Sequence, residues 1–229
     1  MRVRSVPSNI EDLNQEIVAC RKCPRLVEWR EAIARDRRRS YQDWDYWGKP
    51  VPNFGDPNAN RLIVGLAPAA HGGNRTGRMF TGDRSGEWLF GALHRAGVAN
   101  QGHSDFLDDG LSLQGVMITA PVHCAPPANK PTPEEFAACA PYLDRLFRSR
   151  HWKSILCLGR LGWLSALRAL GVRGRPRFGH GTQFRTPEGT LLVGCYHPSQ
   201  QNTFTGKLTQ AMLDEAVAAF LETVSNTFP

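Results

Sequence analysis

Two polar loops carry the most chemically versatile side chains of this sequence, and each loop follows a short apolar run. The first, residues 65–86, is dense in glycine and contains Phe80 and Asp83, whereas the second, residues 197–206, begins with His197. An aromatic ring can stack on a flat ligand, a carboxylate can orient or deprotonate water, and an imidazole can donate a hydrogen bond. The residues alone equally allow Phe80 as a core aromatic, Asp83 as a helix N-cap and His197 as a structural histidine.

The glycines of the first loop have two possible uses. They let backbone N–H groups approach a flat ligand closely, and Gly72 and Gly77 also have the glycine spacing of a phosphate-binding P-loop. The P-loop pattern fails at the next positions, because Arg78 and Met79 stand where its Lys and Ser/Thr should be. We therefore exclude a nucleotide kinase or ATPase and expect no nucleotide cofactor.

The cysteines fall into two groups. Cys157 and Cys195 lie inside apolar runs and are expected to be small core residues. The other group comes from separated segments, and its thiolates are suited to Zn²⁺ or a [4Fe–4S] cluster: Cys20, Cys23, Cys124 and Cys139. Their spacing is not that of a zinc ribbon, which favours iron–sulfur, while four unrelated buried cysteines remain an alternative. A cluster here would clamp the N-terminal segment onto the rest of the chain.

The composition is that of a globular protein with a basic surface. The chain has 229 residues, 41% of them hydrophobic, and a formal net charge of +7. This excess suits a polyanionic partner, although an ordinary basic enzyme fits it as well. No run approaches the roughly 20 apolar residues of a membrane span, and Met1-Arg2-Val3-Arg4 does not lead into an apolar signal core. We expect a cytoplasmic protein with no membrane partner.

Strands and helices alternate along the chain in a way that places both loops at one sheet edge. Short apolar runs predict strands at 61–66, 116–119, 154–158 and 190–196, and helical spacing predicts helices at 86–96 and 161–170. Thr132-Pro133-Glu134-Glu135 is a helix start, with a hydroxyl at the N-cap and Pro at the first helical position. A C-terminal helix begins near Leu208. Such alternation predicts an α/β fold with a mostly parallel sheet, whose ligands bind at the carboxyl ends of the strands.

The remaining segments complete the predicted organisation. The first forty residues are charged and helical, and residues 46–60 form an irregular connector rich in Pro and Gly. We expect a single domain over residues 1–229, with residues 1–60 packed on it as a helical and connector segment.

The two loops together resemble the uracil-DNA glycosylase superfamily, and more narrowly its family 5. The similar segments are Gly65-Leu66-Ala67-Pro68-Ala69, Asn74-Arg75-Thr76-Gly77-Arg78, Phe80-Thr81-Gly82-Asp83, His197-Pro198-Ser199 and Gln201-Asn202. Cys20 to Val27 and Cys124 to Cys139 resemble the same family. The resemblance spans Cys20 to about Thr209.

This resemblance implies a fold, a cofactor and a reaction. The fold is a three-layer α/β/α sandwich around a small, mostly parallel central sheet. Cys20, Cys23, Cys124 and Cys139 fall on the positions that hold a [4Fe–4S] cluster. The reaction is excision of uracil and of other deaminated or modified bases, such as hypoxanthine and ethenocytosine, from DNA.

The resemblance also implies roles for individual residues. Phe80 would stack on the flipped base, Asn129 and His197 would hydrogen-bond to it, and Asp83 would position the attacking water. Gly65 and Leu66 open the first loop and would contribute backbone contacts to the base. Positions 66–70 offer no carboxylate or amide (Leu66, Ala67, Pro68, Ala69 and Ala70), which leaves Asp83 as the candidate carboxylate.

We further expect phosphate contacts and a wedge on the DNA side of the loops. The expected DNA-binding residues are Arg75, Arg78, Ser199, Gln201, Asn202 and Lys207, and residues 200–204 would wedge into the duplex. No lysine lies in the core of either loop, so we expect a monofunctional enzyme that leaves an abasic site. We also expect the protein to act as a monomer. The competing hypothesis is a non-catalytic, metal-scaffolded nucleic-acid-binding module, which would explain the charge and the cysteines but not Phe80, Asp83 and His197.

Overall fold

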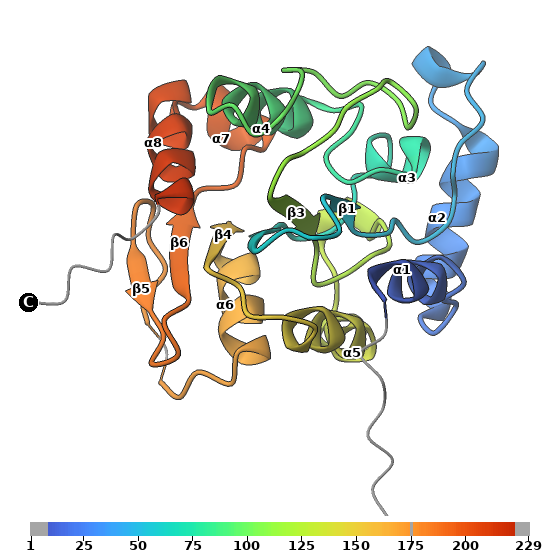
Figure 1. The fold of residues 1–229 in the computed structure, drawn as a ribbon. Helices are drawn as coiled ribbons and strands as arrows, with labels where there is room; N and C mark the ends of the chain where they lie inside the picture. Colours follow the sequence, from blue (N-terminus) through green and yellow to red (C-terminus); the bar gives the residue numbers. More distant parts are fainter. Residues whose placement is uncertain (1–8, 175, 223–229) are drawn as a thin grey trace, which may run out of the picture.

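The computed structural model describes residues 9–174 and 176–222. Its described elements form three layers, with the sheet in the middle (Figure 1). Helices α3, α4, α7 and α8 cover one face, and α1, α5 and α6 cover the other. The predicted three-layer α/β/α arrangement is therefore present in the described residues. The prediction that the chain has no signal core used residues 1–4, which lie outside the described residues. Both ends of the predicted domain 1–229 lie outside them as well.

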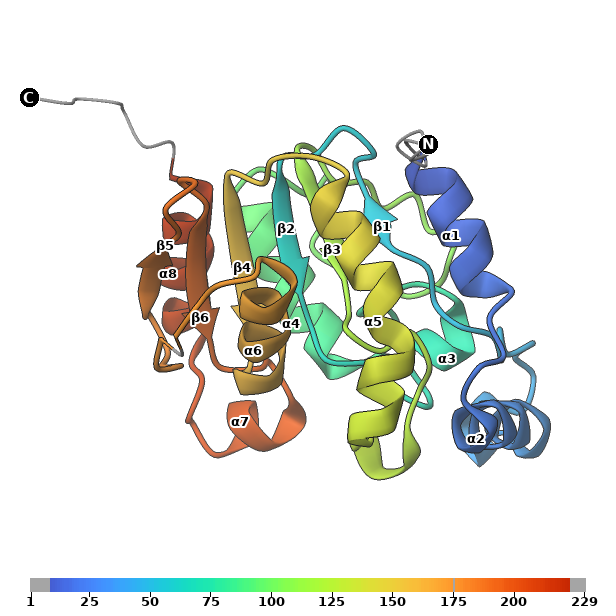
Figure 2. The ribbon, with the colours of Figure 1, turned by 90° about the horizontal axis from the view of Figure 1, so that it is seen from below.

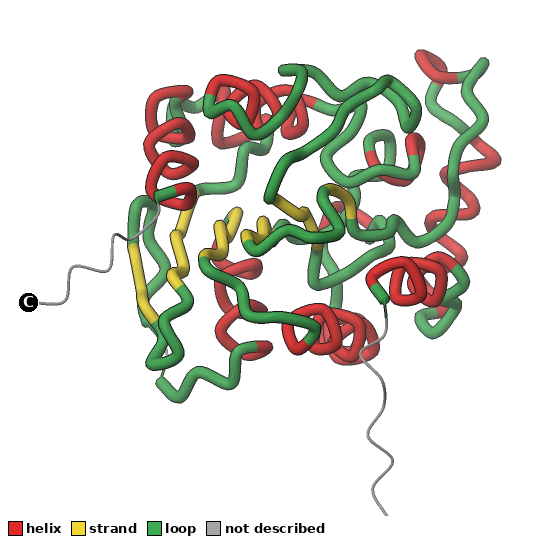
Figure 3. Tube along the Cα trace, in the orientation of Figure 1, coloured by secondary structure: helices red, strands yellow, loops and turns green. Residues whose placement is uncertain are grey.

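The element bounds are as follows. The strands are β1 (Phe54–Gly55), β2 (Arg61–Val64), β3 (Val116–Thr119), β4 (Ser154–Leu158), β5 (Gln183–Arg185) and β6 (Leu191–Cys195). The α-helices are α1 (Ile10–Val18), α2 (Pro24–Asp36), α3 (Gly73–Thr76), α4 (Arg84–Arg95), α5 (Pro133–Arg148), α6 (Arg160–Ala169), α7 (Gln200–Phe204) and α8 (Gln210–Leu221), and the 3-10 turns are η1 (Arg39–Tyr41) and η2 (Pro127–Asn129). Long irregular segments join several of them (Figure 3).

The described strands form one mixed sheet in the order β1-β3-β2-β4-β6-β5. Its four central strands are parallel, and they are the four strands predicted from apolar runs. The edge strands β1 and β5 pair antiparallel and were not predicted. β1 is two residues long and lies inside the Pro- and Gly-rich connector. The residues of β5 are exposed or half-buried and do not form an apolar run. Short edge strands of this kind leave no continuous apolar signal in the sequence.

Local sequence signals explain where the longer helices begin. At α5, the Thr132 side chain accepts from the Glu135 backbone N–H and the Glu135 carboxylate accepts from the Thr132 N–H, so the predicted start is confirmed as a capping box. Ser199 and Thr209 cap α7 and α8 in the same side-chain-to-backbone manner. The short helices α3 and α7 lie inside the predicted loops, since a single helical turn has no periodic pattern to detect.

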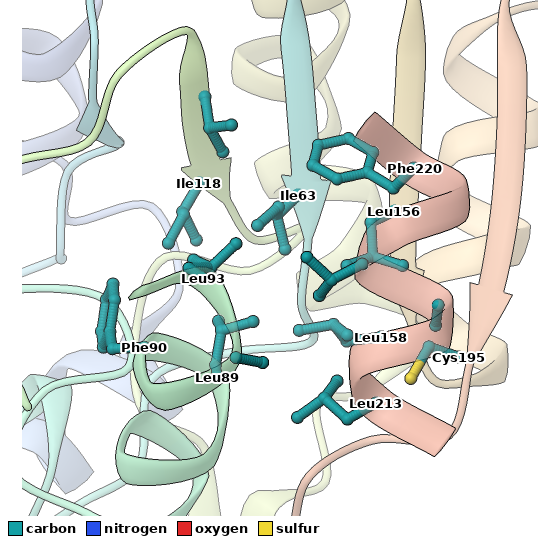
Figure 4. Close-up of a cluster of buried hydrophobic side chains, with 14 of the residues drawn as sticks. Ile63, Leu89, Phe90, Leu93, Ile118, Leu156, Leu158, Cys195, Leu213 and Phe220 are labelled. Carbon is teal, nitrogen blue, oxygen red and sulfur yellow. The ribbon is translucent and has the colours of Figure 1, made fainter. Parts of the chain in front are cut away.

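Two apolar cores hold the helical layers to the sheet. One face packs Ile63, Ile118 and Leu156 against Leu93 of α4 and Phe220 of α8 (Figure 4). On the opposite face a second cluster joins α1, α5 and α6 to the sheet. Cys157 and Cys195 are fully buried in these clusters, which confirms them as core residues.

The N-terminal segment packs along the side of the sandwich. Asn14 of α1 and Asn53 of the connector bond to each other through side chains and backbone, with Asn53 Nδ2 donating to Asn14 Oδ1 at 2.8 Å. α2 lies beside α3 of the first loop (Figure 1). None of the helices in residues 9–174 and 176–222 is both long and apolar enough to cross a membrane.

Candidate active site

The carboxyl ends of the central strands meet at a topological switch point. After β2 the chain passes to α4 on one face, whereas after β4 it passes to α6 on the opposite face (Figure 1). Strands β2 and β6 both point toward the edge where α7 lies (Figure 2). α6 begins very close to β2, because a Cβ on Gly162 would lie 2.8 Å from the carbonyl oxygens of Val64 and Gly65. Ligands bind at such crevices in open α/β sheets.

Phe80 and His197, one from each predicted loop, lie against each other at this edge. Their ring centroids are 5.9 Å apart and their planes differ by 29°. The Phe80 ring also covers the end of β2, where a Cβ on Gly65 would lie 2.9 Å from its Cζ. Phe80 has a φ of +54°, a conformation that costs a non-glycine residue about 1–3 kcal/mol. Gly86 permits it, because a Cβ there would overlap the Phe80 carbonyl oxygen.

His197 is held in its neutral form. Burial lowers the pKa of this imidazole from 6.5 to about 4. The His197 carbonyl oxygen accepts a hydrogen bond from Asn202 Nδ2 at 2.8 Å. On its other side the chain passes close to Gly159, because a Cβ added there would lie 3.5 Å from the His197 Cβ. At neutral pH the ring therefore carries one N–H donor and one acceptor nitrogen and no charge.

Asp83 is the N-cap of α4, as the sequence allowed. Its Oδ1 accepts from the Gly86 backbone N–H at 3.1 Å, and its Oδ2 lies against Gly72, where an ideal Cβ would be only 2.2 Å away. Burial raises the pKa of Asp83, and the backbone N–H of Gly86 and the charge of Arg75 oppose that rise. Within the described residues, no hydrogen bond joins Asp83 to Phe80 or His197. The structure thus brings Asp83 to the same loop but not into contact with that ring pair.

The glycines of the first loop serve the loop itself. Gly72 makes room for the Asp83 carboxylate and Gly82 for the Arg75 guanidinium, which a Cβ would meet at 2.2 Å in both cases. Gly77 has a φ of +82° and faces the Trp47 ring. The expectation that these glycines admit a flat ligand needs this correction, because side chains of the protein fill the space at these three positions.

Four separated cysteines line one cavity on the other side of the molecule. Its walls include Cys20, Cys23, Cys124 and Cys139 together with His123 and Tyr142. Burial raises the pKa of the Cys124 thiol to about 11 and that of Cys139 to about 12. In the described residues, no three His, Cys or carboxylate side chains converge closely enough to hold a single metal ion.

A buried arginine faces this cavity. Arg30 of α2 is 2% exposed, and its Nη1 donates to Cys124 Sγ at 3.0 Å. Its Nη2 donates to the Cys20 carbonyl at 3.3 Å, while its Nε has no partner among the described residues. A buried guanidinium is costly without negative charge nearby, and the side chain it contacts in the cavity is that of Cys124. Sequence reasoning missed Arg30, since one arginine on a charged helix gives no signal.

Comparison with known proteins places this geometry in a family. The family described as the uracil DNA glycosylase superfamily matches residues 52–221, which include both loops. The chain belongs to the uracil-DNA glycosylase superfamily. Within it, the chain is similar to the type-5 uracil-DNA glycosylases of Mycobacterium bovis (54% identity, 90% of this chain and 79% of the relative), Thermus thermophilus (47%, 89% and 93%) and Pyrobaculum aerophilum (43%, 94% and 94%). The narrower family 5 resemblance is thereby confirmed.

Two predicted DNA contacts of this glycosylase superfamily member are buried and bonded within the protein. Arg78 is 2% exposed and pairs with Asp109 at 2.6 Å. Arg75 is 3% exposed, donates to the His71 and Gly82 carbonyls, and lies 4.0 Å from the ring centroids of two aromatic residues, Tyr41 and Trp44. Arg75 thus satisfies carbonyls of its own loop, whereas Arg78 bonds to Thr81 Oγ1, Ser104 Oγ, the Leu107 carbonyl and Asp109. In this arrangement both guanidiniums face inward.

The other predicted contacts occupy the second loop of this glycosylase fold. Ser199 and Asn202 are half-buried and bonded within the loop, whereas Gln201 and Lys207 are exposed. Asn129 is exposed at η2 with a φ of +55°. No contact between Asn129 and the Phe80–His197 pair is present among the described residues.

Sequence reasoning missed the link between the two loops. Arg84, at the start of α4, donates from Nε to Thr203 Oγ1 at 3.2 Å and stacks on Phe204, 4.4 Å from its ring centroid. Phe204 is 68% exposed despite this contact. Arg84 therefore fixes α7 relative to the first loop. Its place next to Asp83, at a helix start, was the only available signal.

Proposed function

We propose that this protein removes uracil from DNA by hydrolysing its N-glycosidic bond, leaving an abasic site. The observation that carries the proposal is the Phe80–His197 pair at the switch point, with His197 kept neutral by burial. An apolar ring and an uncharged donor at one crevice suit a flat, neutral base. The names of the similar proteins support the same reaction.

The first step is extrusion of the nucleotide from the duplex, which costs a few kcal/mol of stacking and pairing. Phe80 offsets part of that cost by stacking on the base, a contact worth about 1–3 kcal/mol. Its strained backbone and its support from Gly65 hold the ring in place before the base arrives. A ring fixed in advance loses little further freedom on binding.

Bond cleavage then produces an oxocarbenium-like sugar and a uracil anion. His197 donates its N–H to a carbonyl oxygen of the base, where negative charge develops. Such a donor is typically worth about 10²–10³ in rate. A neutral donor does not lose its proton to the anion as readily as an imidazolium would. Backbone groups of Gly65 and Leu66 assist from the first loop, and Asn129 contacts the base edge.

Asp83 positions the attacking water in this proposal. Its raised pKa reflects a carboxylate that is poorly solvated, and such a group gains from binding a water. Oδ1 is used by the helix cap, so Oδ2 is the oxygen assigned to the water. Asp83 thus combines a structural and a chemical role, which the variants in the Discussion separate.

We also propose that the four cysteines hold a [4Fe–4S] cluster. Two features support it: the cavity that the four cysteines share, and the hydrogen bond from Arg30 to the Cys124 sulfur. When bound, the cluster supplies a cross-link between the α1–α2 junction and the segment from Cys124 to Cys139. Its role is structural, since the reaction is a hydrolysis. An absorbance near ~400 nm, together with iron and sulfide analysis, tests this independently of activity.

DNA contacts come from the exposed part of the second loop. Gln201 and Lys207 reach the backbone, and α7 with Phe204 wedges into the duplex beside the extruded base. Ser199 and Asn202 support that loop. We further propose that the enzyme acts as a cytoplasmic monomer, uses no lysine Schiff base, and also accepts hypoxanthine and ethenocytosine.

Incubation with a uracil-containing oligonucleotide followed by alkali tests the proposed function. An abasic site breaks under alkali, so strand breaks at the uracil are expected, with none in an oligonucleotide carrying thymine at that position. Omitting the alkali is the control for a lyase activity, and the strand should then stay intact. Binding without any alkali-dependent break would instead support the non-catalytic nucleic-acid-binding module.

A further inference from the structure

Arg30 is a buried charge that the glycosylase reaction does not use. It lies on α2 and its side chain reaches the cysteine cavity, where it donates to Cys124 Sγ and to the Cys20 carbonyl. Burying a guanidinium without a counter-charge costs several kcal/mol. The question is therefore which group compensates it.

The nearby carboxylates are occupied elsewhere. Glu31, the next residue along the chain, pairs with Arg21, and Glu135, which lines the cavity, pairs with Arg25. No ion pair of Arg30 with a carboxylate is present in residues 9–174 and 176–222. Four thiolates carry four negative charges, whereas the core of a [4Fe–4S] cluster carries two positive charges. The loaded site would therefore have a net negative charge next to the Arg30 guanidinium. The counter-charge of Arg30 is therefore the loaded cysteine site.

The same residue is also attached to the base-binding loop. The backbone carbonyl of Arg30 accepts from Asn74 Nδ2 at 3.2 Å, and both residues are buried. Asn74 in turn is fixed by its backbone, since its N–H donates to the Ala69 carbonyl and its carbonyl accepts from the Gly48 N–H. One residue thus joins the Cys124 sulfur to the loop that carries Phe80.

We propose that Arg30 is a positioning residue that neutralises the metal-loaded cysteine site and fastens it to the base-binding loop. The inference rests on the [4Fe–4S] cluster proposed above. It predicts that the sign of Arg30's contribution to stability depends on the metal. With the cluster bound, the guanidinium is compensated and stabilising; without it, the guanidinium is a buried, uncompensated cation and destabilising.

The test compares Arg30→Met and Arg30→Lys with the wild type and with Arg35→Met, an exposed arginine on the same helix. Each protein is prepared with its cluster and after oxidative removal of the iron. The measurements are the rate of iron loss to a chelator, the reduction potential of the cluster, and the midpoint of urea unfolding in both forms. Iron loss and potential are measured on the loaded protein and do not require that the metal-free variants fold.

Arg30→Met should lose iron about 10–100-fold faster than the wild type, in the range found for partners of metal ligands. Its potential should become more negative, because an N–H···S bond and a positive charge are lost. It should unfold at lower urea than the wild type when loaded and at higher urea when metal-free. Arg30→Lys keeps the charge and should show a smaller shift in potential, and Arg35→Met should match the wild type.

Equal destabilisation of both forms, with unchanged iron loss and potential, would overturn the inference and make Arg30 an ordinary packing residue. A wild-type protein that contains neither iron nor sulfide would overturn the cluster proposal itself, and this inference with it. Excision of uracil is measured separately in the same preparations. Failure of the glycosylase proposal is therefore distinguishable from failure of either metal proposal.

Discussion

Two sets of side chains meet on the first loop, and they are built in opposite ways. In the arginine network, defined by Arg78, Thr81, Ser104 and Asp109, the groups bond closely to one another. Burial disfavours the Asp109 carboxylate, but the Arg78 guanidinium and backbone N–H donors outweigh burial and hold its pKa at about 2. This network has no capacity left for a ligand.

The proposed base pocket, defined by Phe80, Asp83 and His197, is the opposite case. Burial raises the pKa of Asp83 and lowers that of His197, and neither side chain has an ion-pair partner among the described residues. The guanidiniums of Arg75 and Arg78 are turned to loop carbonyls and to the arginine network. The first loop therefore uses these two arginines to hold its own shape and leaves the side chains of the proposed pocket weakly bonded.

Asp83→Asn gives the largest expected effect on activity. An amide cannot hold or deprotonate water as a carboxylate does, so the excision rate should fall by about 10²–10⁴. Asn caps helices as well as Asp, so the free energy of unfolding should stay within about 0.5 kcal/mol of the wild type. Single-turnover excision and urea unfolding measure the two effects. A full rate in Asp83→Asn would leave only the capping role.

Arg78→Met should damage stability rather than DNA binding. Removing one partner of a buried ion pair leaves an uncompensated Asp109, which costs about 3–5 kcal/mol. Because the Arg78 guanidinium is buried in its pair with Asp109, the dependence of DNA affinity on salt should keep its slope. Lys207→Ala is the matched control and should lower that slope by about one unit. A reduced slope in Arg78→Met would restore the phosphate role.

Phe80→Leu should weaken capture of the extruded base by about 1–3 kcal/mol. The fold should be little affected, because the ring is only partly buried and leucine is also apolar. The affinity for an oligonucleotide that carries a non-cleavable uracil analogue measures this loss of binding free energy. Phe90→Leu, at a buried position of α4, is the control and should lower stability without changing base capture.

The smallest effect is the dependence of stability on pH. The folded pKa of His197 is about 4 against 6.5 in the unfolded chain, so the unfolded chain binds more protons between these values. The stability from neutral His197 is therefore complete above pH 6.5 and is lost as the pH falls toward 4. Urea midpoints at pH 7.5, 6 and 5 measure it, and His197→Asn should flatten the slope. An unchanged slope would show that His197 titrates normally.

The sequence was sufficient for the parts of the fold that depend on local patterns. The four central strands are continuous apolar runs, and Thr132 caps α5 by a motif of four residues. Edge strands β1 and β5 escaped because they are short and lack an apolar run. Pairing of Phe80 with His197 could be expected from the order of strands, since parallel strands bring their carboxyl ends together.

The orientation of the arginines was not predictable in the same way. Arg75 and Arg78 lie in a loop that resembles a nucleic-acid site, and nothing local distinguishes a guanidinium that faces solvent from one that faces inward. The partners that turn them inward are far along the chain: Tyr41 and Trp44 for Arg75, and Asp109 for Arg78. Arg30 escaped for the same reason, because its partners Cys124 and Asn74 come from distant segments.

The most direct test of the central claim is single-turnover excision of uracil by the wild type and by His197→Ala at pH 7.5. The account predicts alkali-sensitive cleavage by the wild type and a rate about 10²–10³ lower in the variant, with a closely similar urea midpoint at that pH. His197→Gln, which retains an N–H donor, should recover part of the loss. A variant as fast as the wild type would contradict the claim that the Phe80–His197 pair is the catalytic pocket.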